Sequence, residues 1–195
     1  MVGIGQGRLR CAREPVGGWP VLFDLVSPKT QLDIWVLPLE GERKSVSFQA
    51  TQAFDAQARF SPDGHWVAYM STESGANQVY VRPFRMNSSG TAMEPGGKWQ
   101  VSNKPGREPR WRADGRELFY VNAPGGGVMA VDIAAGPEFR AGKPHALGLT
   151  IPLSGTTSNL LWDVSADGQR FIGVADPGGQ EPITVVMNWQ AGLKK

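Results

Sequence analysis

Cysteine and histidine are scarce in this sequence, which has one cysteine and two histidines among 195 residues. The lone Cys11 can form neither an intramolecular disulfide nor a cysteine-based metal site. His65 and His145 lie far apart in the chain, so they show no zinc-ligand spacing. No Asp-x-Asp-x-Asp run of a calcium loop is present either. We therefore expect no metal and no cofactor.

Long apolar runs are also missing. No stretch reaches the roughly 18 to 20 apolar residues of a membrane helix, so we expect no membrane insertion. Residues 1–10 are rich in glycine and lack the apolar core of a signal peptide, and by itself this predicts a cytoplasmic location. The net charge is +2, from 20 basic and 18 acidic residues, which is too even to indicate nucleic acid as a partner.

Turn-forming residues, in contrast, are abundant. The chain has 25 glycines and 15 prolines, which indicates many turns and short elements. It also has seven tryptophans, whose large flat side chains suit the packed faces of sheets. No stretch shows the pattern of an amphipathic helix. The expected fold class is all-β.

An Asp-Gly pair recurs in one setting, between two short alternating strands. Glycine accepts a positive φ and the aspartate side chain caps the turn, so each copy predicts a tight hairpin. The successive glycines are 51 and 53 residues apart. We assign these pairs a structural role; they are Asp63-Gly64, Asp114-Gly115 and Asp167-Gly168.

Further strands follow each hairpin. We expect third strands at 78–84, 128–133 and 183–189, with an earlier relative at 33–39, and fourth strands at 45–48, 99–102 and 145–149. The polar loop 85–98 is expected to be exposed. A period near 50 residues with four short strands in each unit is typical of β-propeller blades.

The repeat predicts a partial β-propeller of about three and a half four-stranded antiparallel blades. The blades are expected at 19–50, 51–103, 104–150 and 151–189, after an irregular segment, 1–18. The first unit lacks its first strand and the last lacks its fourth. We therefore expect an open arc, whose exposed blade edges pair with another chain or with missing blades.

The segment Phe60-Ser61-Pro62-Asp63-Gly64, followed by Trp66-Val67-Ala68-Tyr69, resembles the signature of the TolB-like, WD40-like (PD40) propeller repeat. Segments 33–39, 78–84 and 183–195 also resemble the C-terminal propeller of bacterial receptor-type serine/threonine protein kinases. There, a kinase domain and a membrane helix precede a propeller that lies outside the cytoplasm. Because this chain matches no kinase motif, the resemblance implies a sensing or docking role and no kinase activity.

Two classes of function remain open. The first is a non-catalytic module that binds a protein, peptide or small ligand, as the C-terminal fragment of a larger sensor protein. The alternative is the accessory propeller of an enzyme, either a receptor-type kinase or a peptidase of the prolyl oligopeptidase type. Such a peptidase needs a Gly-x-Ser-x-Gly elbow, and the nearest segment, 71–75, lacks the leading glycine, so we predict no catalytic residue. A truncated gene product without a function of its own is a third possibility.

Three charged residues are the candidate ligand contacts. Arg59, Arg110 and Asp163 open the strand before each Asp-Gly turn. If that strand is the innermost of its blade, these side chains would lie towards the central channel. The alternating aromatic residues around them, such as Trp66, are interpreted as packing between neighbouring blades.

Overall fold

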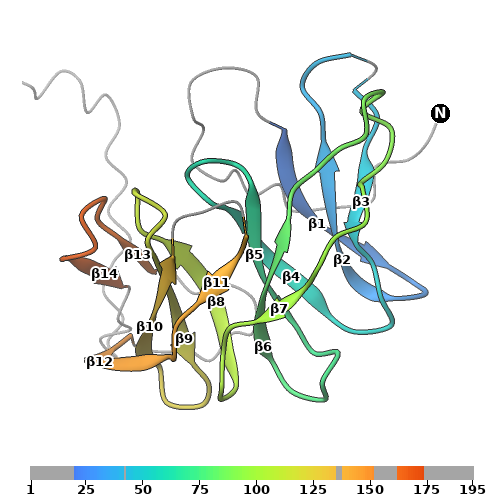
Figure 1. Cartoon of the computed structure of the whole chain (residues 1–195). Helices are drawn as coiled ribbons and strands as arrows, with labels where there is room; N and C mark the ends of the chain where they lie inside the picture. Colours follow the sequence, from blue (N-terminus) through green and yellow to red (C-terminus); the bar gives the residue numbers. More distant parts are fainter. Residues whose placement is uncertain (1–19, 42, 135–137, 152–161, 174–195) are drawn as a thin grey trace, which may run out of the picture.

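The computed structural model describes residues 20–41, 43–134, 138–151 and 162–173. In these residues every regular element is a β-strand, and the strands form four antiparallel sheets (Figure 1). The predictions for 1–18 and for the strand at 183–189 lie outside the described residues. The all-β class is confirmed.

The sheets follow one another along the chain, and we call them blades 1 to 4. Blade 1 holds β1 (Val21–Ser27), β2 (Gln31–Leu37) and β3 (Val46–Gln49). Blade 2 holds β4 (Asp55–Phe60), β5 (Trp66–Ser71), β6 (Gln78–Pro83) and β7 (Trp99–Gln100). Blade 3 holds β8 (Gly106–Trp111), β9 (Glu117–Asn122) and β10 (Gly127–Ala134), with β11 (Arg140–Ala141) and β12 (His145–Thr150) both paired to β10. Blade 4 is described as the pair β13 (Trp162–Val164) and β14 (Phe171–Gly173).

Apolar clusters lie between successive blades. Ile34 and Val36 of blade 1 pack with Tyr69 of blade 2, and Val79 and Val81 on its other face pack with blade 3. The far face of blade 3 packs in the same way on blade 4. The first strands β4 and β8 lie beside each other, and β4 also lies beside β1 and β2. Sheets stacked face to face with their first strands together form the arrangement of a partial β-propeller.

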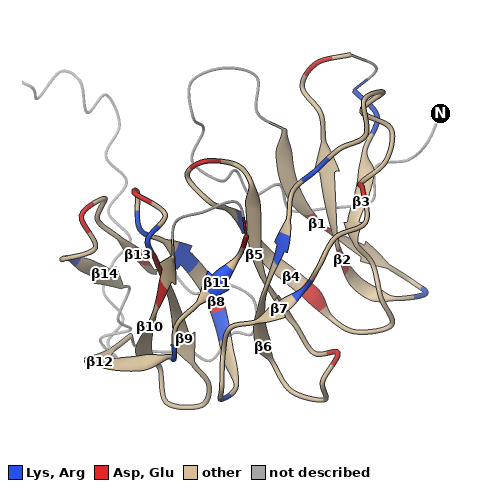
Figure 2. Cartoon of the chain, in the orientation of Figure 1, with Lys and Arg blue, Asp and Glu red and all other residues tan. Residues whose placement is uncertain are grey.

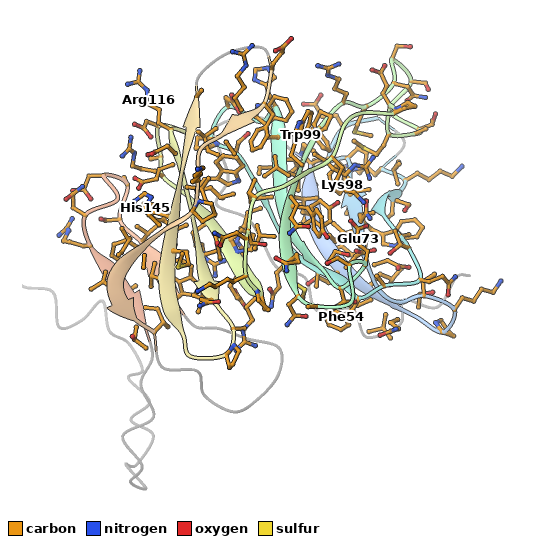
Figure 3. All side chains as sticks on the ribbon, turned by 60° about the horizontal axis from the view of Figure 1, so that its bottom comes forward. Phe54, Glu73, Lys98, Trp99, Arg116 and His145 are labelled. Carbon is orange, nitrogen blue, oxygen red and sulfur yellow. The ribbon has the colours of Figure 1, made fainter. Side chains whose placement is uncertain are left out.

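Aromatic side chains fill these spaces, as predicted. Tyr69, Tyr120 and Phe119 are buried in the three clusters. Between blades 2 and 3, the rings of Trp66 in β5 and Trp99 in β7 meet edge to face, with their centroids 5.6 Å apart. Phe139 contacts both rings. Figure 3 labels Trp99 among the side chains of the fold. Edge-to-face contacts of this kind add stability beyond the buried area alone.

The first and third Asp-Gly turns share one hydrogen-bond pattern. The Ser61 hydroxyl donates to Asp63 Oδ1 (2.6 Å) and accepts from the Trp66 backbone N–H (2.9 Å). Asp63 Oδ1 also accepts from the His65 N–H (3.1 Å). Ser165 and Asp167 form the same contacts in blade 4, where the Ser165 hydroxyl lowers the pKa of Asp167.

An arginine takes the place of the serine in the middle turn. Arg112 donates from Nε and Nη2 to the two carboxylate oxygens of Asp114, at 2.7 and 2.8 Å. These charged hydrogen bonds hold the pKa of Asp114 at about 2. The glycine after each aspartate has a φ between 72° and 74°, in the left-handed region. Two different side chains thus close the same backbone turn.

The structure corrects the prediction for the loop at 85–98. Met86 and Met93 face each other in an isolated antiparallel bridge. Both side chains are partly buried against the cluster between blades 1 and 2, beside Phe60 and Phe84. The loop is therefore not wholly exposed, because its two thioether side chains gain from leaving water. The short strand β11 was not predicted, because two residues are too few to show the alternation of apolar and polar side chains that identifies a strand.

A substitution at Gly115 tests the requirement for a left-handed turn residue. Gly115→Ala is expected to lower the free energy of unfolding by about 1 to 2 kcal/mol, because an added Cβ strains this backbone conformation. The site itself has room, since the nearest atom to such a Cβ lies 3.7 Å away. Urea unfolding followed by tryptophan fluorescence measures the change. Gly127→Ala is the control; Gly127 lacks a positive φ and has no atom within 4 Å, so a change within about 0.5 kcal/mol is expected. Equal losses in the two variants would contradict the explanation.

Candidate functional site

The candidate site is built on the inner strands β4 and β8. Each strand has a break in its register with the second strand of its blade, between Ala56 and Arg59 in β4 and between Arg107 and Arg110 in β8. Gln57 and Glu108, within these bulges, have φ values of 64° and 57°. A left-handed conformation at a non-glycine residue costs of order 1 to 3 kcal/mol and persists only when other contacts hold it.

Reciprocal hydrogen bonds join the two bulges. Gln57 Nε2 donates to Glu108 Oε1 (3.1 Å), and the Glu108 backbone N–H donates to Gln57 Oε1 (3.0 Å). The Gln57 backbone N–H reaches Asp24 Oδ2 of blade 1 at 3.4 Å. Glu108 is wholly buried. A side chain of blade 2 thus holds the backbone of blade 3.

Arg110 connects Glu108 of blade 3 with blade 4. Its Nη2 donates to Glu108 Oε2 (3.1 Å) and to the Trp162 carbonyl (3.2 Å). Its guanidinium lies 5.3 Å from the centre of the Trp162 ring, and its Nε is 3.8 Å from Asp163 Oδ1. We call the run Asp24, Gln57, Glu108, Arg110 and Asp163 the axial polar chain. It links all four blades across their inner strands.

The three predicted contact residues lie in different environments. Arg110 and Asp163 come together, but the Arg110 side chain is only 10% exposed whereas that of Asp163 is 73% exposed. Figure 2 shows basic and acidic residues spread over the strands of the described sheets. Arg59 is half-buried; its Nη1 donates to the Ala58 carbonyl (3.1 Å), and its own carbonyl accepts from Trp111 Nε1 (3.2 Å).

Gln57 and Glu108 were missed by the sequence analysis. The signal was present, because each stands seven positions before its turn glycine, in Gln57-Ala58-Arg59 and Glu108-Pro109-Arg110. A polar residue that recurs at one strand position predicts either an exposed face or a hydrogen-bonded bulge. Choosing between them required the neighbouring blade.

Asp55 is a second buried carboxylate, at the start of β4. Its Oδ2 accepts from both the backbone N–H (3.1 Å) and the hydroxyl (2.8 Å) of Thr51. Burial raises its pKa above the usual 3.8, although hydrogen bonds from Ser71 and Thr51 oppose the change. This carboxyl group is therefore a titratable group inside the fold.

The described residues hold neither a metal-ligand cluster nor a membrane-spanning helix. Among them, no group of three or more His, Cys, Asp or Glu side chains is placed to hold a metal ion. None of the elements described is a helix long and apolar enough to cross a membrane.

The chain was also compared with known proteins. No family model matches it. It is similar to Tricorn protease homolog 1 of Streptomyces coelicolor, with 28% identity over 178 residues, covering 78% of this chain and 16% of that protein. Among solved structures, it is similar to a TolB-like protein of Agrobacterium tumefaciens, with a TM-score of 0.47 and 13% identity over 67% of this chain and 47% of that one. TolB of Acinetobacter baumannii gives a TM-score of 0.39 and 15% identity over 83% and 47%.

The chain spans about half the length of these two solved structures and a much smaller share of the Streptomyces protein. Because both TM-scores lie below 0.5, the assignment as a partial propeller rests on the packing of the sheets. The closer resemblance to receptor-type kinases stays a prediction.

Removing the buried charge of Glu108 tests the axial polar chain. Glu108→Gln is expected to lower the free energy of unfolding by about 3 kcal/mol, because Arg110 loses its buried counter-charge. Glu138→Gln is the matched control. Glu138 pairs with Arg140 at 3.0 Å, but both side chains are exposed, so a loss below about 1 kcal/mol is expected. Urea unfolding of both variants measures the difference, and similar losses would contradict a structural role for the buried pair.

The buried Asp55 carboxyl group predicts a pH dependence. Its pKa in the folded protein lies above the ordinary value of 3.8. Asp55 therefore contributes most to stability at low pH, where it is protonated, and this contribution is lost as the pH rises through the folded-state pKa. Asp55→Asn cannot ionise. The free energy of unfolding of this variant should therefore rise relative to the unsubstituted protein between pH 4 and 8.

Asp167→Asn provides a control of opposite sign. The pKa of Asp167 is lowered, so its contribution to stability is present above 3.8 and is lost as the pH falls. This variant should become less stable relative to the unsubstituted protein as the pH rises. Urea unfolding from about pH 2 to 8 covers both transitions, and parallel pH profiles of the two variants would refute the assignment.

Proposed function

We propose that this chain is a non-catalytic propeller module that binds a protein, a peptide or a small polar ligand. The observation that carries the proposal is the equivalent placement of Arg59, Arg110 and Asp163 on successive inner strands. At this repeat position the half-buried Arg59 and the exposed Asp163 offer charges of both signs, whereas Arg110 is buried beside Glu108. A peptide carries both signs at its own termini and side chains.

The axial polar chain supports the same proposal through rigidity. Glu108 and Trp162 hold the Arg110 guanidinium from two blades, so its position is set before a ligand arrives. Charged groups held in this way lose little side-chain entropy on binding. The exposed Asp163 carboxylate lies at the accessible end of the chain. A ligand cation is therefore expected to meet Asp163 first.

The alternative, an accessory propeller of an enzyme, is favoured by one finding. The chain is similar to a segment of a protein named as a Tricorn protease homologue. In this interpretation the propeller would bind substrate for a catalytic domain elsewhere in a longer polypeptide. The predicted kinase relationship would give a sensor on a receptor outside the cytoplasm. An in-frame protease or kinase domain encoded beside this segment would favour the alternative.

Peptide selection tests the binding proposal. The immobilised full chain is panned against a displayed library of random dodecapeptides, and recovered peptides are titrated by fluorescence anisotropy. Arg59→Glu and Asp163→Lys should each weaken binding by about tenfold or more, because each reverses a charge at the inner edge. Lys29→Glu, at an exposed turn of blade 1, is the control and should leave affinity within about twofold.

Two results would contradict the proposal. One is a library that yields no peptide above background. The other is a set of peptides whose affinity changes as much with Lys29→Glu as with the inner-strand variants.

A further inference from the structure

Blades 1, 2 and 3 each carry a bulky cross-strand pair at one repeat position. Its members are directly opposed partners on two adjacent antiparallel strands, so they lie on one face of their sheet. We call it the blade-facing pair; the three examples are Phe23 with Trp35, Tyr69 with Tyr80, and Tyr120 with Met129.

In blades 2 and 3 the preceding blade covers this pair. Tyr69 and Tyr80 are 0% and 4% exposed, in a cluster with residues of blade 1 such as Ile34. Tyr120 is equally buried, in a cluster with Val79 of blade 2. The pair therefore marks the face that each blade presents to the sheet before it.

Blade 1 presents the same face without a described sheet on it. Phe23 and Trp35 are only half-buried, as are Leu25 and Leu37 on the same face. The opposite face of blade 1, with Ile34, is covered by blade 2. In Figure 1 blade 1 lies at one end of the series of described sheets. The unmatched face has the composition of an interface between blades.

The other end of the series also has a face on which no further sheet is described. Trp162, Val164 and Phe171 of blade 4 pack on blade 3. Asp163 and Ile172 are cross-strand partners on the opposite face, and Ile172 is 69% exposed. The described part of the chain thus offers both halves of a contact between blades, one at each end.

We infer that two copies of this chain associate head to tail, with blade 1 of each copy seated on blade 4 of the other. A second copy is the occupant that carries the matching face in the required orientation. Contacts of this heterologous kind close into a ring when the rotation allows. Two copies of the four described sheets fall within the range of about four to eight blades with which propellers close. The blade 4 face that the second copy would cover also carries Asp163, so the dimer contact and the proposed peptide site share this residue.

The mass of the full chain in solution tests the inference. Light scattering after size exclusion, from about 1 to 100 µM, should show a dimer that dissociates on dilution. Ile172→Glu should weaken dimerisation by about 30-fold or more, which is the effect of losing one central apolar contact. Because Ile172 is exposed, this variant should keep the fold.

Val26→Glu is the matched control. Val26 is 68% exposed, nearly the same as Ile172, and lies in β1 at a position facing away from the blade-facing pair. This variant should dimerise as the unsubstituted chain does. Trp35→Glu removes the opposite half of the contact and should also give monomers, with a far-UV circular dichroism spectrum that confirms its fold.

Mixing the two monomeric variants gives the sharpest result. Ile172→Glu retains an intact blade 1 face and Trp35→Glu retains an intact blade 4 face, so an equimolar mixture should regain one working contact and form heterodimers. A chain that is monomeric at every concentration would overturn the inference. So would a dimer indifferent to Ile172→Glu and Trp35→Glu, or oligomers that grow beyond two copies. A monomer that dimerises only after deletion of residues 1–19 would show that this segment occupies the face instead.

Discussion

The reciprocal hydrogen bonds between Gln57 and Glu108 are the contact on which the arrangement of the inner strands depends. Both residues adopt a backbone conformation that is unfavourable for a side chain of any size. Both are buried, so an unmatched amide or carboxylate there would be costly. The two hydrogen bonds offset the two strained backbone conformations, and they form only when β8 of blade 3 lies in the correct register beside β4 of blade 2.

The apolar clusters between blades and the axial polar chain contribute differently to the fold. Burial of Val79, Tyr69 and their neighbours supplies most of the driving force, but it is non-directional and tolerates small shifts between sheets. The hydrogen bonds of Glu108 and Arg110 have fixed lengths and angles. They set the register between blades, and the same rigid groups lie next to the exposed carboxylate of Asp163.

The hairpins were predictable because their determinants are local. Each turn has four residues and ends in an adjacent aspartate and glycine, and an alternating strand lies on either side of it. The middle turn shows the limit of the rule, since Arg112 performs there what Ser61 performs in blade 2. The outer strands were less predictable. β7 has two residues and β11 has two, and each forms only because a longer strand already lies beside it.

By itself the sequence determined the all-β class, the position of each hairpin and the spacing of the repeat, because these follow from turn chemistry and from alternation over a few residues. Only the tertiary structure decided that Arg110 is buried, that Asp163 is exposed, and that Gln57 and Glu108 hold the blades together. The reason is distance along the chain. These partners are about 50 residues apart, and no local pattern records which blade face will meet them.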